Sequence, residues 1–200
     1  KKSQENDEEQ KWDKFEDTHN GRDDSDSDQY RYPYEPTPYK VLERLANSGL
    51  LRKGNTLLDY GCGKGRVDFF LSYQTRCHTI GVEYNERIYE KAVENKEQGA
   101  AAGRTEFVFA DAVQFSVPAS VDGSTFSIIF NRDIKEVLAR VLESYYENPR
   151  DLFLFFYYPS DEYISYLMTV DELVFSDEID CRDLFPGENK RERIVVFEVG

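Results

Sequence analysis

The stretch Leu57-Leu-Asp-Tyr-Gly-Cys-Gly-Lys-Gly65 decides how the chain is interpreted. Its two leucines are typical of the end of a buried parallel strand. Its three glycines permit a tight turn and the close approach of a ligand to the backbone, because no Cβ stands in the way. Val67, Phe70 and Leu71 then follow at helical spacing. The pattern predicts a strand, a glycine-rich turn and an amphipathic helix, in that order.

A second apolar run, His78-Thr-Ile-Gly-Val-Glu83, ends in a carboxylate 18 residues past Gly65. An acid at the carboxyl end of the second strand can accept hydrogen bonds from both hydroxyls of a ribose. A glycine-rich turn alone is a common loop, and it gains meaning from the strand before it, the helix after it and this acid. The combination predicts a nucleoside-binding crevice at the carboxyl ends of the strands.

Composition limits the class of protein. The 200 residues suit one domain, and the chain lacks the run of about 18 apolar residues that a transmembrane helix needs. The N-terminus is too polar for a secretory signal. Three cysteines without metal-type spacing, Cys62, Cys77 and Cys181, favour a reducing, cytoplasmic setting. The net charge of −14 disfavours a nucleic-acid partner, whereas cationic or neutral substrates approach such a surface more easily.

Residues 1–29 form an acidic segment ahead of the predicted domain, which spans residues 30–200. The segment carries 5 basic and 11 acidic side chains, a net charge of −6, and few apolar residues. This composition is typical of a disordered tail. However, Trp12 and Phe15 lie three residues apart, so they can share one face of a short helix. We expect this helix to dock on the domain or on a neighbouring chain.

Beyond the acidic segment, strands alternate with helices, which predicts an α/β fold. The expected strands are 55–60, 78–83, 105–110, 126–130, 152–158, 173–179 and 193–199. Helices are expected after Thr37, Gly65, Asn85, Asp133 and Ser160, with Thr37 as the cap of the first and Pro38 as its first residue. The last two strands have no convincing helix between them, so we expect an antiparallel pair at one sheet edge.

This order of elements resembles the class I S-adenosylmethionine-dependent methyltransferases over residues 30–199. The resemblance implies a Rossmann-like, doubly wound sheet that is mostly parallel with an antiparallel C-terminal strand. Asp59–Gly65 looks like the first cofactor motif of that family, and Glu83 looks like its ribose-binding acid. Asp111, followed by Ala112, looks like the residue that meets the adenine amino group.

Asn131 sits where the motif after the fourth strand lies in that family, close to the transferred methyl group. Many amino-group methyltransferases have Asn or Asp, two prolines and an aromatic residue there, whereas this chain has Asn131-Arg-Asp-Ile134. The stretch Tyr34-Glu-Pro-Thr-Pro-Tyr39 is similar to certain protein-lysine methyltransferases, in which an N-terminal loop folds over the cofactor. This similarity implies that Tyr34 and Thr37 are cofactor neighbours and that a protein lysine is one candidate acceptor.

The expected cofactor contacts surround a single crevice. They are Tyr34, Thr37, Asp59, Gly61, Cys62, Gly63, Lys64, Gly65, Glu83, Tyr84, Asp111, Ala112 and Asn131. Carboxylates at 59, 83 and 111 suit a cofactor that bears a sulfonium and an ammonium, and suit a pyrophosphate less well. Within this set, Cys62 is expected to be a small residue that fits the turn, not a nucleophile.

Methyl transfer from a sulfonium is a direct displacement, so the enzyme mainly positions a nucleophile in line with the methyl group. No metal and no Ser/His/Asp set is needed, and His19 and His78 are expected to be structural or solvated. The candidates to orient an acceptor are Asn131, Tyr157 and Tyr158, at the ends of the fourth and fifth strands. Asn131 and Tyr157 are the candidate catalytic residues.

The acceptor is an unidentified nucleophile, with a protein lysine or a small-molecule amine as candidates. An NAD(P)-dependent oxidoreductase is an alternative, because it shares the glycine turn and the ribose acid. Asp59 and Asp111 argue against it, since a pyrophosphate would have to approach them. A non-catalytic S-adenosylmethionine-binding module is a further alternative, because the same fold can host binding without turnover. The sequence determines neither the acceptor nor the oligomeric state.

Overall fold

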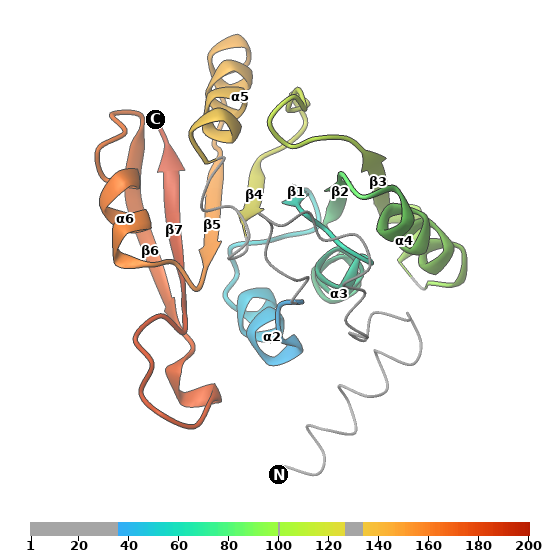
Figure 1. Cartoon of the computed structure of the whole chain (residues 1–200), viewed down its shortest axis with the longest axis horizontal. Coiled ribbons are helices and arrows are strands. Elements are labelled where there is room, and N and C mark those ends of the chain that lie inside the picture. Colours follow the sequence, from blue (N-terminus) through green and yellow to red (C-terminus); the bar gives the residue numbers. More distant parts are fainter. Residues whose placement is uncertain (1–35, 100, 127–133) are drawn as a thin grey trace.

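A computed structural model describes residues 36–99, 101–126 and 134–200. The described strands form one seven-stranded sheet in the order β3-β2-β1-β4-β5-β7-β6. Helices cover both of its faces (Figure 1). Neighbours from β3 to β5 pair in parallel, whereas β7 pairs antiparallel with both β5 and β6. The predicted doubly wound, mostly parallel sheet with antiparallel C-terminal strands is confirmed.

The elements follow the expected alternation. The strands are β1 (Thr56–Tyr60), β2 (His78–Glu83), β3 (Thr105–Phe109), β4 (Gly123–Phe126), β5 (Phe153–Tyr157), β6 (Leu173–Asp180) and β7 (Arg193–Val199). The helices are α2 (Tyr39–Asn47), α3 (Arg66–Thr75), α4 (Glu86–Gln98), α5 (Ile134–Glu147) and α6 (Asp161–Leu167), with short 3-10 turns η2 (Ala102–Arg104) and η4 (Arg182–Leu184). Asn85 and Ser160 cap α4 and α6 through their side chains.

Two expectations about local structure were wrong. The fourth strand begins at Gly123, not at Phe126, and its continuation over 127–130 lies outside the described residues. Glycine is disfavoured in strands, but Leu57 and Phe155 pack over this one. Thr37 does not cap α2: the cap position is Pro38, and no side chain caps the helix. The helix begins at Tyr39, so Thr37 lies one residue too early to cap it.

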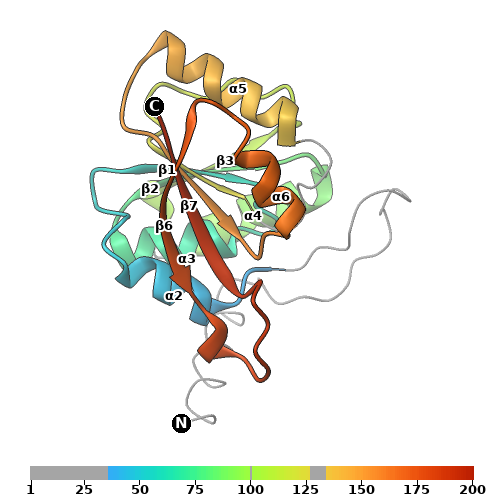
Figure 2. The same cartoon turned by 90° about the vertical axis from the view of Figure 1, so that its left-hand side faces the viewer.

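Helices α2, α3 and α4 lie on one face of the sheet, and α5 and α6 lie on the other, as two perpendicular views show (Figures 1 and 2). The face of α2 and α3 buries a cluster that includes Leu45, Leu57 and Phe155. The opposite face buries a cluster that includes Leu58 and Phe156. Alternate residues of β1 and β5 therefore enter different cores, as expected for strands that are covered on both sides.

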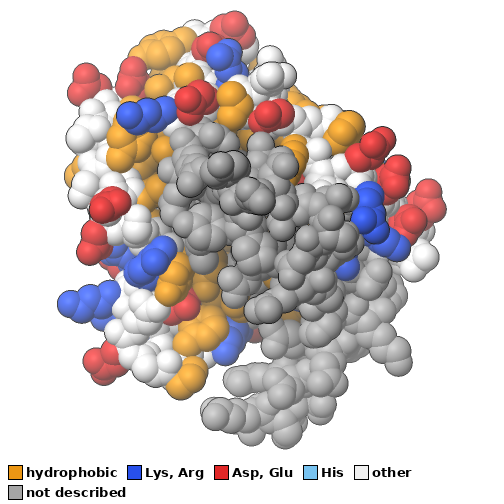
Figure 3. Space-filling model, in the orientation of Figure 1, with side chains coloured by type: hydrophobic (Ala, Val, Ile, Leu, Met, Phe, Trp, Pro, Cys, Tyr) orange, Lys and Arg blue, Asp and Glu red, His pale blue; other side chains and the backbone are white. Residues whose placement is uncertain are grey.

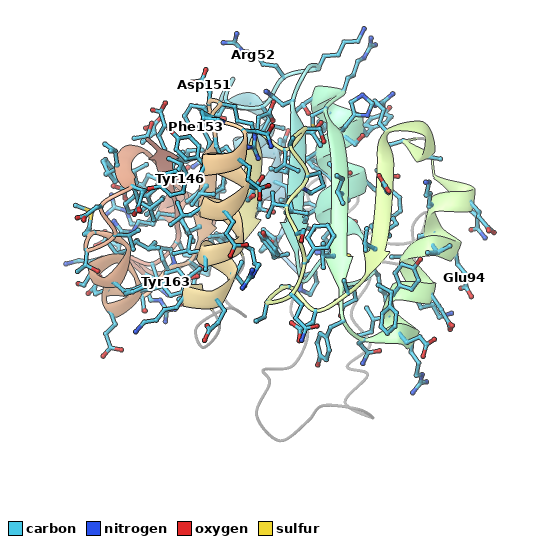
Figure 4. The ribbon with its side chains drawn as sticks, turned by 90° about the horizontal axis from the view of Figure 1, so that it is seen from above. Arg52, Glu94, Tyr146, Asp151, Phe153 and Tyr163 are labelled. Carbon is cyan, nitrogen blue, oxygen red and sulfur yellow. The ribbon has the colours of Figure 1, made fainter. Side chains whose placement is uncertain are left out.

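The parallel strands all begin at one end of the sheet, here called the start edge, and all finish at the opposite end, here called the carboxyl edge. Arg52 and Asp151, which precede β1 and β5, lie near the start edge, and Tyr163, which follows β5, lies toward the carboxyl edge (Figure 4). The site residues gather at the carboxyl edge, because parallel strands all end there. The outermost strand, β6, is interrupted by a bulge between Phe175 and Asp177. Within the described ranges, no helix has the length and apolar character needed to cross a membrane.

Candidate functional site

The glycine turn after β1 is built as the sequence predicts. Gly61, Gly63 and Gly65 have φ angles of 67°, 57° and 96°. These values lie in the left-handed region, where a side chain would be strained. The backbone N–H groups of Gly61 and Cys62 donate to the carbonyl oxygen of Val82 over 2.9 and 3.1 Å. The turn is therefore fixed to the end of the neighbouring strand β2.

Glu83 closes the other side of this turn. Its Oε1 accepts the N–H of Gly63 over 3.1 Å, and its Oε2 accepts the N–H of Asn85 over 2.9 Å. Burial raises the pKa of the Glu83 carboxyl, while backbone donors at Asn85, Gly63 and Tyr84 oppose the shift. Each oxygen of a carboxylate has a second acceptor position, so both can still receive a ribose hydroxyl. The bonds to the backbone hold the carboxylate in that orientation.

Cys62 fills the space beneath the turn. A Cβ placed on Gly81 of β2 would lie 2.7 Å from the Cys62 Cβ and 2.8 Å from its Sγ. Burial raises the pKa of the Cys62 thiol well above its usual value, and the nearby acids Asp68, Asp59 and Glu83 raise it further. A buried neutral thiol is a poor nucleophile. This environment suits the expected role of a small residue that fits the turn.

Asp59 lies on β1, on the sheet face that packs against α3. Its Oδ1 accepts the hydroxyl of Thr125 over 3.1 Å, and Thr125 stands directly opposite it on β4. Asp59 is 5% exposed, and burial raises the pKa of its carboxyl group. A buried acid beside a positive-φ glycine turn fits the ammonium end of an amino-acid ligand.

Arg66, the first residue of α3, connects the N-terminal lead to the turn. Its guanidinium lies over the ring of Tyr39, 4.3 Å from the centroid, and it donates to the carbonyl oxygen of Thr37 over 3.5 Å. Thr37 is 9% exposed. The structure therefore brings Thr37 next to the residue that follows Gly65. Tyr34, the other predicted N-terminal contact, lies outside the described residues.

The predicted adenine contacts lie around the ends of β2 and β3. The N–H of Ala110 donates to the carbonyl oxygen of Glu83 over 3.0 Å, which ties the two strand ends together. Asp111 is exposed, and its Oδ1 accepts the N–H of Val113 over 3.0 Å. Tyr84 is 40% exposed, and Ala112 is half-buried. Lys64 contributes its carbonyl oxygen to a bond with Asn95 of α4.

A second cluster of polar side chains lies at the carboxyl end of β5. The hydroxyl of Tyr157 donates to Glu192 Oε2 over 2.7 Å. Burial raises the pKa of Tyr157, and its hydrogen bond to Glu192 raises it further, so the phenol keeps its proton. Tyr158 has a φ of 55°, an uncommon conformation for a bulky residue. Asn189 donates to the Tyr158 hydroxyl over 2.6 Å.

A phenol that keeps its proton can donate a hydrogen bond but does not act as a base, and this applies to Tyr157. The other candidate catalytic residue, Asn131, lies outside the described residues, as does Asp133. Four residues of the site escaped the sequence interpretation: Arg66, Asp68, Thr125 and Glu192. Arg66 directly follows the last glycine, which was an available signal. The other three become visible only through strand register or tertiary contact.

Comparison with known proteins agrees with this geometry. A sequence model of a methyltransferase domain family matches residues 51–150, which is half of the chain and includes the glycine turn and Glu83. The chain belongs to this methyltransferase family. It is accordingly an S-adenosylmethionine-dependent methyltransferase, and the predicted resemblance is confirmed.

The methyltransferase is 25% identical over 112 residues to a protein-lysine N-methyltransferase of Saccharolobus islandicus, an alignment covering 56% of this chain and 68% of that protein. Its fold is similar to that of an RNA methyltransferase from Salinibacter ruber in complex with S-adenosyl-L-homocysteine. The TM-score is 0.58 at 16% identity, over 82% of this chain and 92% of the other.

The fold is also similar to that of magnesium protoporphyrin IX methyltransferase from Synechocystis with bound S-adenosylmethionine. Here the TM-score is 0.53 at 17% identity, over 80% of this chain and 75% of the other. Two further curated methyltransferases match 42% of this chain, and the alignments span only 31% and 15% of their own lengths.

Proposed function

We propose that the methyltransferase transfers the methyl group of S-adenosylmethionine to an amine, with a protein lysine as the leading acceptor. The supporting observation is the pair formed by Tyr157 and Glu192 at the carboxyl end of β5. A carboxylate held there can attract a cationic amine. The similarity to the protein-lysine N-methyltransferase of Saccharolobus islandicus and the net charge of −14 also support this acceptor.

On the cofactor side, we assign Glu83 to the ribose hydroxyls and Asp59 to the ammonium of the methionine portion. The glycine turn, Gly61 to Gly65, would lie against the backbone of that portion, since its positive φ angles leave no side chain in the way. Asp111, Ala112 and Tyr84 would border the adenine. When bound, the cofactor supplies a methyl group on a sulfonium that is already activated for displacement.

On the acceptor side, Glu192 would attract the amine, and Tyr157 would hold the Glu192 carboxylate in place. The amine must lose its proton before it attacks, and a carboxylate within hydrogen-bond reach can direct that proton toward solvent. The enzyme then needs only to hold the neutral nitrogen in line with the methyl group. Asn131 stays a predicted contributor to this alignment.

The surface supports a protein or a small cation more than a nucleic acid. On the described part of the face in Figure 3, basic side chains are interspersed with acidic ones and do not form a continuous stripe. Proteins that bind nucleic acid usually concentrate Lys and Arg on one face. Together with the net charge of −14, this face disfavours a nucleic-acid acceptor.

The test is transfer of a radiolabelled methyl group to lysine-containing peptides, to free small amines and to RNA. We expect label on amines, and a decrease of at least about tenfold in kcat/KM for Glu192→Gln, because hydrogen bonds to charged groups are strong. Glu188→Gln, an exposed neighbour in the same loop, is the matched control and should behave as wild type. Label on RNA alone would overturn the amine proposal.

A further inference from the structure

Asp68 lies in the first turn of α3 and is fully buried, with 0% of its surface exposed. Its carboxyl group and that of Asp59, on the underlying strand β1, act directly on each other's pKa. Among the described residues, no N–H or O–H group outside the pair donates to either oxygen of Asp68 or to Oδ2 of Asp59. Two buried carboxyl groups in this position have a donor between them only if one of them carries a proton. A single shared proton satisfies both groups.

The proton belongs on Asp68. Asp59 accepts the hydroxyl of Thr125 over 3.1 Å, and this donor stabilises its ionised form. Neither oxygen of Asp68 receives a hydrogen bond from another described residue. Burial raises the pKa of Asp68 well above its usual value, and the charge of Asp59 raises it further. Asp68 is thus the donor of the pair, and Asp59 is the carboxylate.

The surroundings of Asp59 and Asp68 favour one negative charge on the pair and not two. The other titratable groups that act on the pair are Cys62 in the glycine turn, Cys77 before β2 and Glu83 at the end of β2. All three are neutral or negative, so none of them compensates for a second anion. Ionising both aspartates would place two unscreened charges side by side in the interior, at a large cost.

We propose that Asp68 is a positioning residue for cofactor binding, whose carboxyl group donates to Asp59 and fixes that carboxylate toward the amino-acid end of S-adenosylmethionine. The inference rests on the proposed cofactor site. Asp68 does not touch the cofactor in this arrangement. It determines the orientation of Asp59 and limits the pair to one charge, which matches the single ammonium of the ligand.

Isothermal calorimetry with S-adenosylmethionine tests the proposal. Asp68→Asn should bind within about threefold of wild type, because its amide can still donate to Asp59, whereas Asp68→Ala should bind at least about tenfold more weakly. Ser72→Ala is the matched control: Ser72 is fully buried on the same helix and donates to the Cys77 carbonyl oxygen over 2.9 Å. It should bind as wild type does. Wild-type affinity in Asp68→Ala would overturn the inference.

Infrared spectroscopy provides a measurement that does not depend on binding or on the folding of Asp68→Ala. At neutral pH, the wild-type protein should show the carbonyl stretch of a protonated carboxyl group, and Asp68→Asn should lack it. Absence of that band in wild type would overturn the inference. If wild type shows the band but does not bind S-adenosylmethionine, the proposed cofactor site fails and the proton-sharing pair stands.

Discussion

The side-chain amide of Asn95 donates to the carbonyl oxygen of Lys64 over 3.1 Å, from a helix that lies 31 residues further along the chain. Asn95 is 6% exposed and sits on the inner face of α4. The contact fixes the last part of the glycine turn from outside the β1–α3 unit. We therefore expect cofactor affinity to depend on a helix that provides no expected ligand contact.

Removing this bond should loosen the turn. We expect Asn95→Ala to weaken S-adenosylmethionine binding about fivefold, the equivalent of about 1 kcal/mol for one intramolecular hydrogen bond. Calorimetry measures the affinity. Glu94→Ala is the control, because Glu94 is exposed on the same helix and forms an ion pair with Lys91. Equal affinities for the two variants would show that the turn does not need the support of α4.

A methyl group at position 81 should disturb the turn from below. The Cβ of Gly81→Ala would lie 2.7 Å from the Cys62 Cβ and 2.8 Å from the Phe107 ring. We expect a loss of about 1–3 kcal/mol in the free energy of unfolding, as is typical of overpacked cores. Gly54→Ala, which would meet nothing within 4 Å, should stay within about 0.5 kcal/mol of wild type. Denaturant unfolding measures the free energy of unfolding of both variants. Equal values would contradict the prediction.

Glutamine is a poor substitute for glutamate at position 83. Both oxygens of Glu83 accept backbone N–H groups, so in Glu83→Gln the amide NH₂ must face either Gly63 or Asn85. We expect S-adenosylmethionine to bind at least about tenfold more weakly, because hydrogen bonds to a charged group contribute about 1.5–3 kcal/mol. Glu86→Gln, on the exposed face of α4, should leave the affinity unchanged. Equal binding by both variants would contradict the role of Glu83.

Stability should depend on pH through Asp68. Its pKa in the folded protein lies well above the ordinary value of 3.8, which applies in the unfolded chain. The folded state therefore holds more protons than the unfolded state above that pH, and stability decreases as pH rises toward the folded pKa. The side-chain amide in Asp68→Asn cannot ionise, so the variant lacks this loss of stability. The Tm of Asp68→Asn minus the Tm of wild type should therefore increase from about pH 4 upward. A constant difference across pH would show that Asp68 ionises normally.

Most of the fold followed from local pattern. The glycine turn and the acid at 83 placed their elements correctly, and the helix expected after Asp133 is α5. The start of β4 was missed, because Gly123 and Ser124 have low strand propensity and are held there by neighbouring side chains. The prediction of Thr37 as the helix cap was wrong by one residue, because the cap position is Pro38. Local sequence pattern does not resolve a helix start to one residue.

The site was harder to predict than the fold. Residues within the motif, such as Asp59 and Glu83, were found because their spacing in sequence is fixed by one β–α–β unit. Asp68 looked like an ordinary acid in the first turn of a helix, where negative charge is common. Thr125 reaches the site from β4, and Glu192 reaches it from the residue before β7, far along the chain. Their positions depend on strand pairing, which a single sequence does not specify.

The bulge in β6 has a consequence for how the protein behaves in concentrated solution. Among the described strands, β6 is the last on its side of the sheet, and its outer edge would otherwise offer a template for another chain to add to. The bulge after Phe175 and the acidic Asp177, Glu178 and Asp180 interrupt that template. This edge should therefore resist amyloid-like stacking, even though Val174 and Phe175 are exposed to water.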